Sequence, residues 1–523
     1  MPGWGVLGIV SATKLHIAFL VDGAEVPRWV ARAVEQVAAM EDVVVAVHPA
    51  AGTARAAPSA LTRVWQTLDD RLFAPEWDAA RPAPVDPSPC PAPASTRYDV
   101  VFDTTAAGAS DPPSATHGVW RWSFDAVAGT PPGLAEIVNG ADVVASRLVR
   151  DDGTVLVEGT TTPHPWSPSR QRTWFLYKAS RFAEIAVRDL QRGASPSRSP
   201  LPGDRGPTPV GAPPPPRLWR TAEPKKPRHG ALPGMSRRWV REVTDRALRY
   251  RQWVIGVRHH APDHRWLDGE VEVLRPPAGH FWADPFVVQH EGRTWLFFED
   301  YPYATRRGEI AVMEYRRGTW TEPVPVLQCP YHLSYPFVLT HGEDWYMIPE
   351  TSAARRVELY RATAFPHRWE PVEVLLDDVM AADATVVQHE GRWWMFAGLS
   401  EEGGSASETL HLYSAPDLRG PWTPHRNNPI KCDARSSRPA GRMFRWRGQL
   451  YRPAQDCSYG YGHGVGIHRV EQLDDEGYRE TVVGYVGPTW HPRIRGTHTL
   501  NRCGNIIVVD GLMMPPKWWR RLP

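Results

Sequence analysis

The sequence predicts an α/β domain over residues 1–192 followed by an all-β propeller of five blades within residues 235–523. Three observations lead to this prediction. An apolar strand–helix–strand pattern opens the chain, a proline-rich stretch separates its two halves, and a hairpin pattern recurs five times in the second half. A length of 523 residues leaves room for more than one domain.

The first region has the pattern of a parallel α/β sheet. Residues 15–21 and 43–47 are apolar runs of strand length, and Val30, Val34 and Val37 lie between them at helical spacing. Such a βαβ unit requires parallel strands. Further strands are expected at 98–102, 141–149 and 155–158, with a closing helix at 172–192. No GxGxxG motif follows the first strand, so the pattern predicts a fold class but no dinucleotide cofactor.

Residues 193–234 are expected to form a disordered linker. Pro, Ser, Gly and Arg dominate this stretch, which includes four consecutive prolines at 213–216. Such a composition buries little apolar surface and favours extended polyproline conformations. A helical segment is expected to lead from residue 235 into the second domain.

A repeated hairpin pattern predicts the propeller. Three clear copies begin at His280, Leu333 and Ala381, and weaker copies begin at Arg438 and Gly496. Each copy consists of a strand, a turn and a second strand, and the spacing between copies fits the four short strands of one blade. Residues 270–274 precede the first copy and are expected to complete the last blade. The recurring tryptophans are expected to pack between blades: Trp295, Trp345, Trp394 and Trp422.

The innermost strand of each blade lines the central channel, so equivalent repeat positions should meet at one mouth. Asp284, Tyr335 and Asp383 occupy the same position in the three clear copies. The weaker copies add Arg438, Arg442 and His498. Buried like charges are costly unless a ligand, a cation or an arginine balances them. We therefore predict a binding or catalytic site here, with structural turns or a bound ion as the alternative.

Ordered motifs from about residue 250 to 515 resemble the N-terminal propeller domain of the glucosamine inositolphosphorylceramide transferase family. The motifs are WADPF at 282–286, SYPF at 334–337, MIPE at 347–350, ADAT at 382–385, GPW at 420–422, RPAGR at 438–442, RPAQD at 452–456 and GTHT at 496–499. The resemblance implies a sugar or glycosylated small molecule as partner. In plant members a glycosyltransferase domain follows the propeller. We expect none here because the chain ends at Pro523, so the resemblance does not by itself predict sugar transfer.

The same region is similar, more distantly, to five-bladed glycoside hydrolases of the arabinanase and xylosidase type. That resemblance implies Asp284 as general base and Glu350 as general acid, with Asp383 tuning their pKa values. Tyr335 replaces the second-blade aspartate of those enzymes, and an inter-blade salt bridge is the alternative role for Glu350. The residues expected to contact substrate are Tyr335, Arg438, Arg442, Arg452, Asp456 and His498. No cofactor is predicted, although the resemblance also implies a calcium ion held partly by His498.

The first region resembles a formyltransferase N-terminal domain. The motif GVWRWS at 118–123 falls where that family has Gly-Val-x-Asn-x-His, residues 129–133 fall at its following loop, and Asp151 falls at its Asp-x-Gly. The catalytic Asn and His are thereby replaced by Arg121 and Ser123. Formyl transfer needs those two groups for the proton and the oxyanion of the intermediate. A degenerate scaffold, a recognition domain or a dimerisation unit is therefore predicted.

Composition excludes several other classes. Lys plus Arg is 60 and Asp plus Glu is 58, so a dedicated nucleic-acid binder is not expected. Five scattered cysteines without a CxxC pair predict a reducing compartment and no zinc site. No apolar run has the length of a membrane span, and the short run at 6–10 is not a signal peptide, so we expect a cytoplasmic protein. Three hypotheses remain: a glycosyl-processing enzyme, a non-catalytic glycan-binding propeller, and a formyl or acyl transferase.

Overall fold

The computed structural model describes residues 14–49, 79–85, 97–105, 108–124, 141, 143–164, 167–193, 244, 248–259, 267, 270–401 and 404–517. The chain divides into two compact units, one of residues 1–133, 145–159 and 168–199 and one of residues 134–144, 160–167 and 200–523. The predicted linker at 193–234 and most of the helical segment expected after it lie outside the described residues.

The N-terminal unit is built on a six-stranded sheet in the order β3-β1-β5-β6-β7-β8, accompanied by a two-stranded sheet of β2 and β4. Its elements are β1 (Leu15–Val21), β2 (Glu25–Pro27), α1 (Arg28–Ala38), β3 (Val43–Pro49), β4 (Pro82–Pro84), β5 (Val100–Asp103), β6 (Val119–Phe124), β7 (Val144–Arg150), β8 (Val155–Thr161), α4 (Pro168–Ser180) and α5 (Phe182–Gln191).

The predicted βαβ unit is confirmed, because β1 pairs in parallel with both β3 and β5. The strand β6, which was not predicted, adds a fourth parallel strand, and β7 runs antiparallel to it. On one face of β6, Trp122 donates a hydrogen bond to the carbonyl of Ala179 in α4, and Trp29 of α1 packs against the same indole. The Rossmann-like, formyltransferase-type assignment of this sheet stays a prediction from the sequence.

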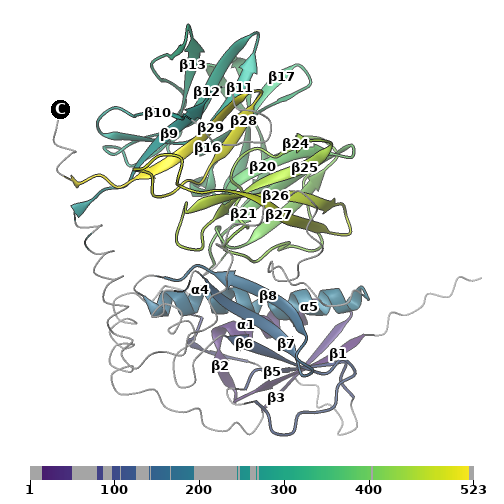
Figure 1. Cartoon of the computed structure of the whole chain (residues 1–523). Helices are drawn as coiled ribbons and strands as arrows, with labels where there is room; N and C mark the ends of the chain where they lie inside the picture. Colours follow the sequence, from purple (N-terminus) through teal and green to yellow (C-terminus); the bar gives the residue numbers. More distant parts are fainter. Residues whose placement is uncertain are drawn as a thin grey trace, which may run out of the picture. The chain divides into compact units, whose positions relative to one another are not determined.

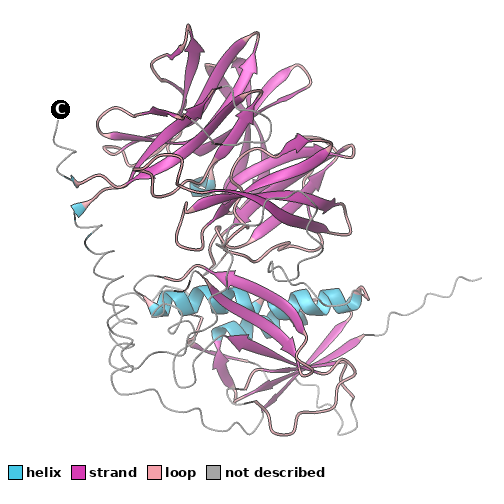
Figure 2. Ribbon diagram, viewed as in Figure 1, coloured by secondary structure: helices cyan, strands magenta, loops and turns pink. Residues whose placement is uncertain are grey.

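The second unit is a five-bladed propeller, and nearly all of its regular secondary structure is strand (Figure 2). Blade 1 contains β11 (His280–His290), β12 (Arg293–Pro302), β13 (Glu309–Arg316), β14 (Thr319–Trp320) and β15 (Val324–Leu327), and blade 2 contains β16 (Ser334–His341), β17 (Asp344–Glu350), β18 (Arg356–Ala364) and β19 (Arg368–Asp377). Blade 3 contains β20 (Ala381–His389), β21 (Arg392–Leu399), β22 (Leu410–Ala415) and β23 (Thr423–Pro424). Blade 4 contains β24 (Phe444–Trp446), β25 (Gln449–Asp456), β26 (Gly464–Leu473) and β27 (Tyr478–Val486).

Blade 5 joins strands from both ends of the propeller sequence. It has the order β10-β9-β29-β28, in which β28 (Leu500–Cys503) and β29 (Ile506–Met513) come from the last hairpin. β9 (Gln252–Arg258) pairs antiparallel with β29, and β10 (Glu272–Leu274) pairs with β9 (Figure 1). The predicted closure by residues 270–274 is confirmed. β9, the strand that directly pairs with the last hairpin, was not foreseen.

Neighbouring blades share apolar clusters because alternate side chains of a strand point to opposite faces. In β12, Trp295 and Phe297 join the cluster of blades 1 to 3, whereas Leu296 and Phe298 join the cluster between blades 5 and 1. Further clusters connect blades 3 and 4 and blades 4 and 5. Trp295 and Trp394 are core members of these clusters and Trp345 and Trp422 pack against them, as predicted from the repeat.

A β-bulge recurs in the innermost strand of blades 1, 2 and 3. Asp284, Tyr335 and Asp383 have positive φ angles of 51°, 44° and 53°, and the strand register shifts at each of them. A bulge redirects the local side chains. Positive φ is unfavourable for residues other than glycine, so the surrounding structure must hold all three in place. The equivalence predicted from the repeat is thus confirmed in the backbone.

Hydrogen bonds link these bulges from blade to blade around the channel. The Asp510 carboxylate of blade 5 accepts from the backbone N–H of Asp284, and the Asp284 carboxylate accepts from that of Tyr335, both at 3.2 Å. The Tyr335 hydroxyl continues the ring to Thr385 in blade 3, and the N–H of Gly441 in blade 4 donates to it. Asn501 of blade 5 closes the ring. Its side-chain oxygen accepts from the N–H of Arg442 at 2.7 Å, and its side-chain nitrogen donates to the carbonyl of Pro285 at 2.8 Å.

Among the described residues, no helix is long and apolar enough to cross a membrane.

The tight approach of blade 4 to blade 5 generates a prediction about Gly441. This residue has φ 128°, and a Cβ atom there would lie 2.2 Å from the carbonyl oxygen of Leu500. We expect Gly441→Ala to destabilise the propeller by at least about 2 kcal/mol, because it combines backbone strain with a steric clash. Gly448→Ala is the matched control, since Gly448 has φ 78° but nothing within 4 Å of such an atom. Calorimetric melting should show the larger loss of Tm for Gly441→Ala. Equal losses would contradict the steric clash between blades 4 and 5 at this position.

Candidate functional site

Asp284 is the centre of a buried group at the junction of blades 5, 1 and 2. Its Oδ1 accepts from the hydroxyl of Thr499 at 2.5 Å and lies 3.5 Å from Nδ1 of His498. Its Oδ2 accepts from the N–H of Tyr335. Burial raises the pKa of Asp284 to about 6, because Asp383 and Asp510 offset the lowering effects of His498 and Thr499.

Asp510 holds the other side of this group. One carboxylate oxygen accepts from the backbone N–H groups of His498 and Thr499 at 2.8 and 3.0 Å. The other lies 2.5 Å from the imidazole Nδ1 of His498. Burial alone would lower the pKa of His498, but Asp510 and Asp284 together raise it above its ordinary value. The imidazolium is therefore the cation that balances these two acids.

Asp383, Glu350 and Arg438 form a second group in the same propeller. The guanidinium of Arg438 donates to Asp383 from Nε at 2.6 Å and to Glu350 from Nη2 at 3.3 Å. Gln455 adds a hydrogen bond to Asp383 at 2.8 Å. Burial raises the pKa of Glu350 well above its ordinary value, Asp383 raises it further, and Arg438 opposes the shift. Burial and Asp383 thereby favour the protonated form of Glu350, beside an acid that is fixed by two donors.

Glu299 is a further channel acid, and it occupies the same repeat position as Glu350. Glu299 pairs in register with Ala283, and Glu350 pairs with Ser334, in each case the residue before the bulge. Burial, followed by the charges of Asp284 and Glu350, raises the pKa of Glu299 well above its ordinary value. His332 lies 3.5 Å from it through Nε2, while the Nδ1 of that imidazole accepts from the N–H of Gly308.

An aromatic residue spans the two groups. Tyr461, in the loop between β25 and β26, packs against His498 with ring centroids 5.1 Å apart. The Arg438 guanidinium lies 5.0 Å from the centre of the same ring. Trp253 of β9 stacks on His498 at 4.1 Å. Gly462 allows this packing, since a Cβ atom there would lie 2.8 Å from the Trp253 ring.

Asp284, His498 and Asp510 are the residues that could hold the expected calcium ion, because they offer three ligand atoms within 4.8 Å of one another. This set of donor atoms does not fit calcium. Calcium takes six to eight oxygen ligands, whereas one donor here is an imidazole nitrogen and the carboxylate oxygens already accept hydrogen bonds. The short contact between His498 Nδ1 and Asp510 occupies the position between the ligands. We therefore derive no step through a calcium ion.

The structure brings together five of the predicted site residues and places four elsewhere or in other roles. Those brought together are Asp284, Glu350, Asp383, Arg438 and His498. Arg452 pairs instead with Glu480 at 2.7 Å, and Arg442 lies over the Phe337 ring and donates to the carbonyl of Val338. Asp456 accepts from the N–H of Ser458 and the hydroxyl of Tyr485.

Tyr335 is the fourth of these residues. Its side chain is fully buried, and its hydroxyl is satisfied by Thr385 and by the N–H of Gly441. A sugar would have to displace those contacts to reach it. Tyr335 therefore links blade 2 to blades 3 and 4 through hydrogen bonds, at the position where the hydrolase pattern has an acid.

Sequence reasoning missed Asp510, Glu299, Thr499, Gln455 and Tyr461. A signal for two of them was present: Glu299 and Asp510 each end an apolar run in the second strand of a hairpin copy, as Glu350 does. An acid at the end of a fully buried strand needs a partner. This requirement could have identified both residues as candidates for the site. Thr499, Gln455 and Tyr461 carry no comparable local pattern.

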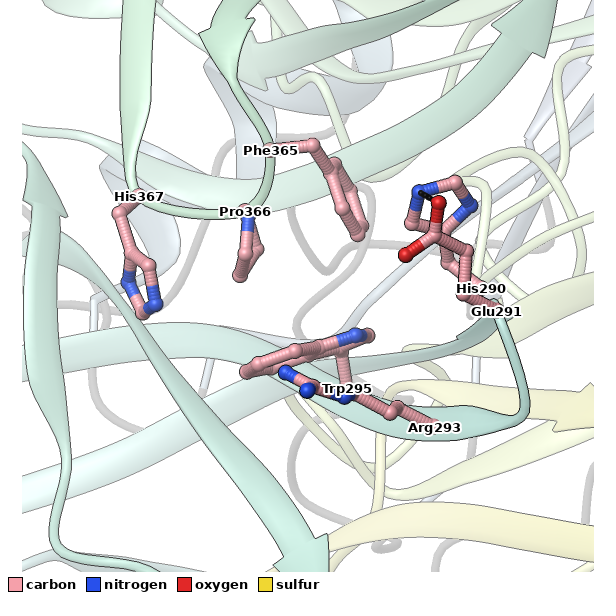
Figure 3. A pocket seen from close by; sticks show the side chains of 7 residues that line it. All are labelled: His290, Glu291, Arg293, Trp295, Phe365, Pro366 and His367. Carbon is pink, nitrogen blue, oxygen red and sulfur yellow. Dashed lines mark ion pairs between the residues drawn. The ribbon is translucent and has the colours of Figure 1, made fainter.

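A shallow hollow lies elsewhere on the propeller, between two turns of blades 1 and 2 (Figure 3). It is lined by His290, Glu291, Arg293, Trp295, Phe365, Pro366 and His367. None of the channel acids takes part in it. Trp295 is buried in the blade core, whereas Phe365 is partly buried.

The formyltransferase-like positions of the N-terminal unit have structural contacts. Arg121 donates from Nε to Asp103 at 2.8 Å. Asp151 accepts from the N–H of Val119 at 3.1 Å and closes the turn at Gly118. Ser123 is an exposed residue of β6. The residues at 129–133 lie outside the described part of the chain.

Residues 274–492 match the family model described as "Glucosamine inositolphosphorylceramide transferase 1, N-terminal". Glucosamine inositolphosphorylceramide transferase 1 of Oryza sativa subsp. japonica is 37% identical over 209 residues, which is 39% of this chain and 28% of that protein. The enzyme of the same name from Arabidopsis thaliana is 37% identical over 213 residues, with the same two coverages. The match thus spans less than a third of the length of these relatives. It supports the resemblance noted for the propeller sequence.

Solved glycoside hydrolases are similar at greater distance. Zg3597, a family 117 glycoside hydrolase of Zobellia galactanivorans, is 12% identical with a TM-score of 0.34, covering 51% of this chain and 90% of that one. A putative glycoside hydrolase from Bacteroides ovatus is 11% identical with a TM-score of 0.35, covering 49% and 96%. Both likenesses are too distant to assign an activity.

The charge of His498 leads to a pH-dependence prediction. Because its pKa is raised in the folded state, its stabilising contribution is complete below the ordinary value of 6.5 and is lost as the pH rises through the folded value. We expect His498→Gln to cost more unfolding free energy at pH 6 than at pH 9. Urea unfolding of both proteins at the two pH values measures this difference. A cost that does not change with pH would show that the imidazole is not charged in the fold.

Proposed function

We propose that the propeller binds a glycosyl group at the channel mouth and hydrolyses or transfers it, with Asp284 as general base and Glu350 as general acid. One observation carries the proposal. Two carboxyl groups that interact inside the propeller have different environments: the pKa of Asp284 is raised to about 6, whereas burial and the charge of Asp383 favour the protonated form of Glu350. Carboxyl pairs separated in this way are what glycosidic bond cleavage requires.

In the proposed reaction, the Glu350 carboxyl donates its proton to the oxygen of the leaving group. Asp284 takes a proton from the attacking water in hydrolysis, or from an acceptor hydroxyl in transfer. Asp383 keeps the proton on Glu350 by its negative charge, while Arg438 and Gln455 fix its position. His498 and Thr499 orient the Asp284 carboxylate.

The substrate class is a proposal drawn from the matched relatives. Their name, glucosamine inositolphosphorylceramide transferase, makes a glucosamine-bearing glycolipid headgroup the first class to test. The match covers only the propeller part of this chain, so sugar hydrolysis and sugar transfer are both tested.

A non-catalytic glycan-binding propeller is the second candidate. It is favoured by the contacts of Asp383, which is engaged by both Arg438 and Gln455, and by the buried Tyr335 at the second-blade position. In that case the channel acids would accept hydrogen bonds from sugar hydroxyls without proton transfer.

For the N-terminal unit we propose a non-catalytic role as a scaffold or recognition unit related to formyltransferases. Arg121 replaces the catalytic Asn of that family and is paired with Asp103, and Ser123 replaces its His. At these positions the unit lacks the groups that would transfer the proton and stabilise the oxyanion in formyl or acyl transfer.

Turnover of p-nitrophenyl glycosides, glycolipid headgroups and nucleotide sugars by the full chain tests the first proposal. We expect Asp284→Asn and Glu350→Gln each to lower kcat by about 10²- to 10⁴-fold. Wild-type activity should rise as the pH increases through about 6, where Asp284 ionises, and fall at higher pH as Glu350 loses its proton.

Asp377→Asn is the control variant, because that aspartate belongs to an exposed ion pair with 71% of its side chain accessible. It should leave turnover unchanged. Binding of glycosides without turnover by the wild type would select the glycan-binding candidate. Neither binding nor turnover of any compound would reject both candidates.

A further inference from the structure

Two exposed tyrosines lie two residues apart in the loop between β25 and β26. Tyr461 is 39% exposed and Tyr459 is 47% exposed, whereas the other Phe, Trp and Tyr side chains among the described propeller residues are buried or half-buried. The loop contains Gly460 and Gly462 at positive φ angles of 133° and 72°. Their surroundings differ, since Tyr461 contacts Arg438 and His498, whereas Tyr459 packs against His463.

Tyr461 is placed where it can present a ring to a ligand over the channel acids. The ring is held by Arg438, which bridges Asp383 and Glu350, by His498, and by Trp253 at 6.4 Å between ring centroids. The residue nevertheless keeps 39% of its surface open to solvent. A partly exposed aromatic ring that is held in place packs well on flat apolar surfaces, such as the C–H face of a pyranose.

The charges around Tyr461 restrict what can bind beside it. The three aspartates Asp284, Asp383 and Asp510 already outnumber the cations of Arg438 and His498. Glu299 and Glu350 add two further acids without adding a cation. The Arg438 guanidinium is already engaged by two carboxyl groups. His498 is likewise engaged by Asp284 and Asp510, so an anionic group on the sugar ring itself would meet an excess of negative charge and be repelled.

We propose that Tyr461 is the platform on which the sugar ring stacks, and that this subsite takes neutral or ammonium-bearing pyranosides and rejects anionic ones. The inference rests on the proposed function and adds the ring contact and the charge class of the substrate. It assigns Tyr461 a binding role and no part in proton transfer.

The test uses the full chain and calorimetric titration with methyl glycosides of glucose, xylose, glucosamine and N-acetylglucosamine, and with the methyl glycoside of glucuronic acid as the anionic probe. We expect a neutral or amino glycoside to bind and the glucuronide not to bind measurably. Tyr461→Ala should weaken binding about tenfold, and Tyr461→Phe should stay within about twofold, because the ring carries the contact. Tyr459→Ala is the matched control and should bind like the wild type.

Saturation-transfer NMR adds a readout that a structural role would not give. Signals from the C–H face of the bound sugar should be saturated in the wild type and in Tyr461→Phe, and lost in Tyr461→Ala. A lowered Tm for Tyr461→Ala with unchanged affinity would overturn the platform and leave a purely structural tyrosine. Tighter binding of the glucuronide would overturn the charge class.

Different results would reject the Tyr461 platform and the proposed glycosyl chemistry. If Asp284→Asn abolishes turnover while Tyr461→Ala leaves affinity unchanged, the platform is wrong and the proposed chemistry stands. If the wild type neither binds nor turns over any of the glycosides, the proposed function fails and the platform fails with it.

Discussion

The propeller depends on the burial of several carboxyl groups at the places where its innermost strands meet. Each of these groups must find a partner across a blade boundary, since an unpaired buried charge costs several kcal/mol. Asp510 and Asp284 therefore accept from backbone N–H groups of the following blade, and Asp383 binds Arg438 and Gln455 of blade 4. These contacts convert a cost of burial into a closed polar ring that connects five separate sheets.

Apolar packing and this polar ring act at different depths of each blade. Away from the channel, alternate side chains of a strand such as β12 insert into the clusters on its two sides. At the channel the bulges interrupt this alternation and turn Asp284, Tyr335 and Asp383 toward their neighbours. Pairing of β29 with β9 closes the sheet system, so the polar ring can close as well.

The hairpins, the five blades and the shared position of Asp284, Tyr335 and Asp383 could be predicted because repeat spacing and apolar periodicity are local properties of the sequence. The partners of the charged groups could not. Arg438 and Arg452 lie in closely similar motifs, yet one meets Asp383 and the other meets Glu480, and only the three-dimensional order of strands decides between them. Asp510 acts on residues 226 positions away, a separation that no sequence pattern encodes.

Two glutamates in the interior of the propeller have opposite pKa shifts. Both have an arginine partner. Although burial alone would raise the pKa of Glu480, Arg452, His468 and Lys431 hold it well below its ordinary value. Glu350 has the opposite shift, because burial is reinforced by Asp383 and opposed only by Arg438, which it shares with that aspartate. The first arrangement is balanced and makes a stable internal salt bridge. The second favours the protonated form of Glu350, as the proposed role of general acid requires.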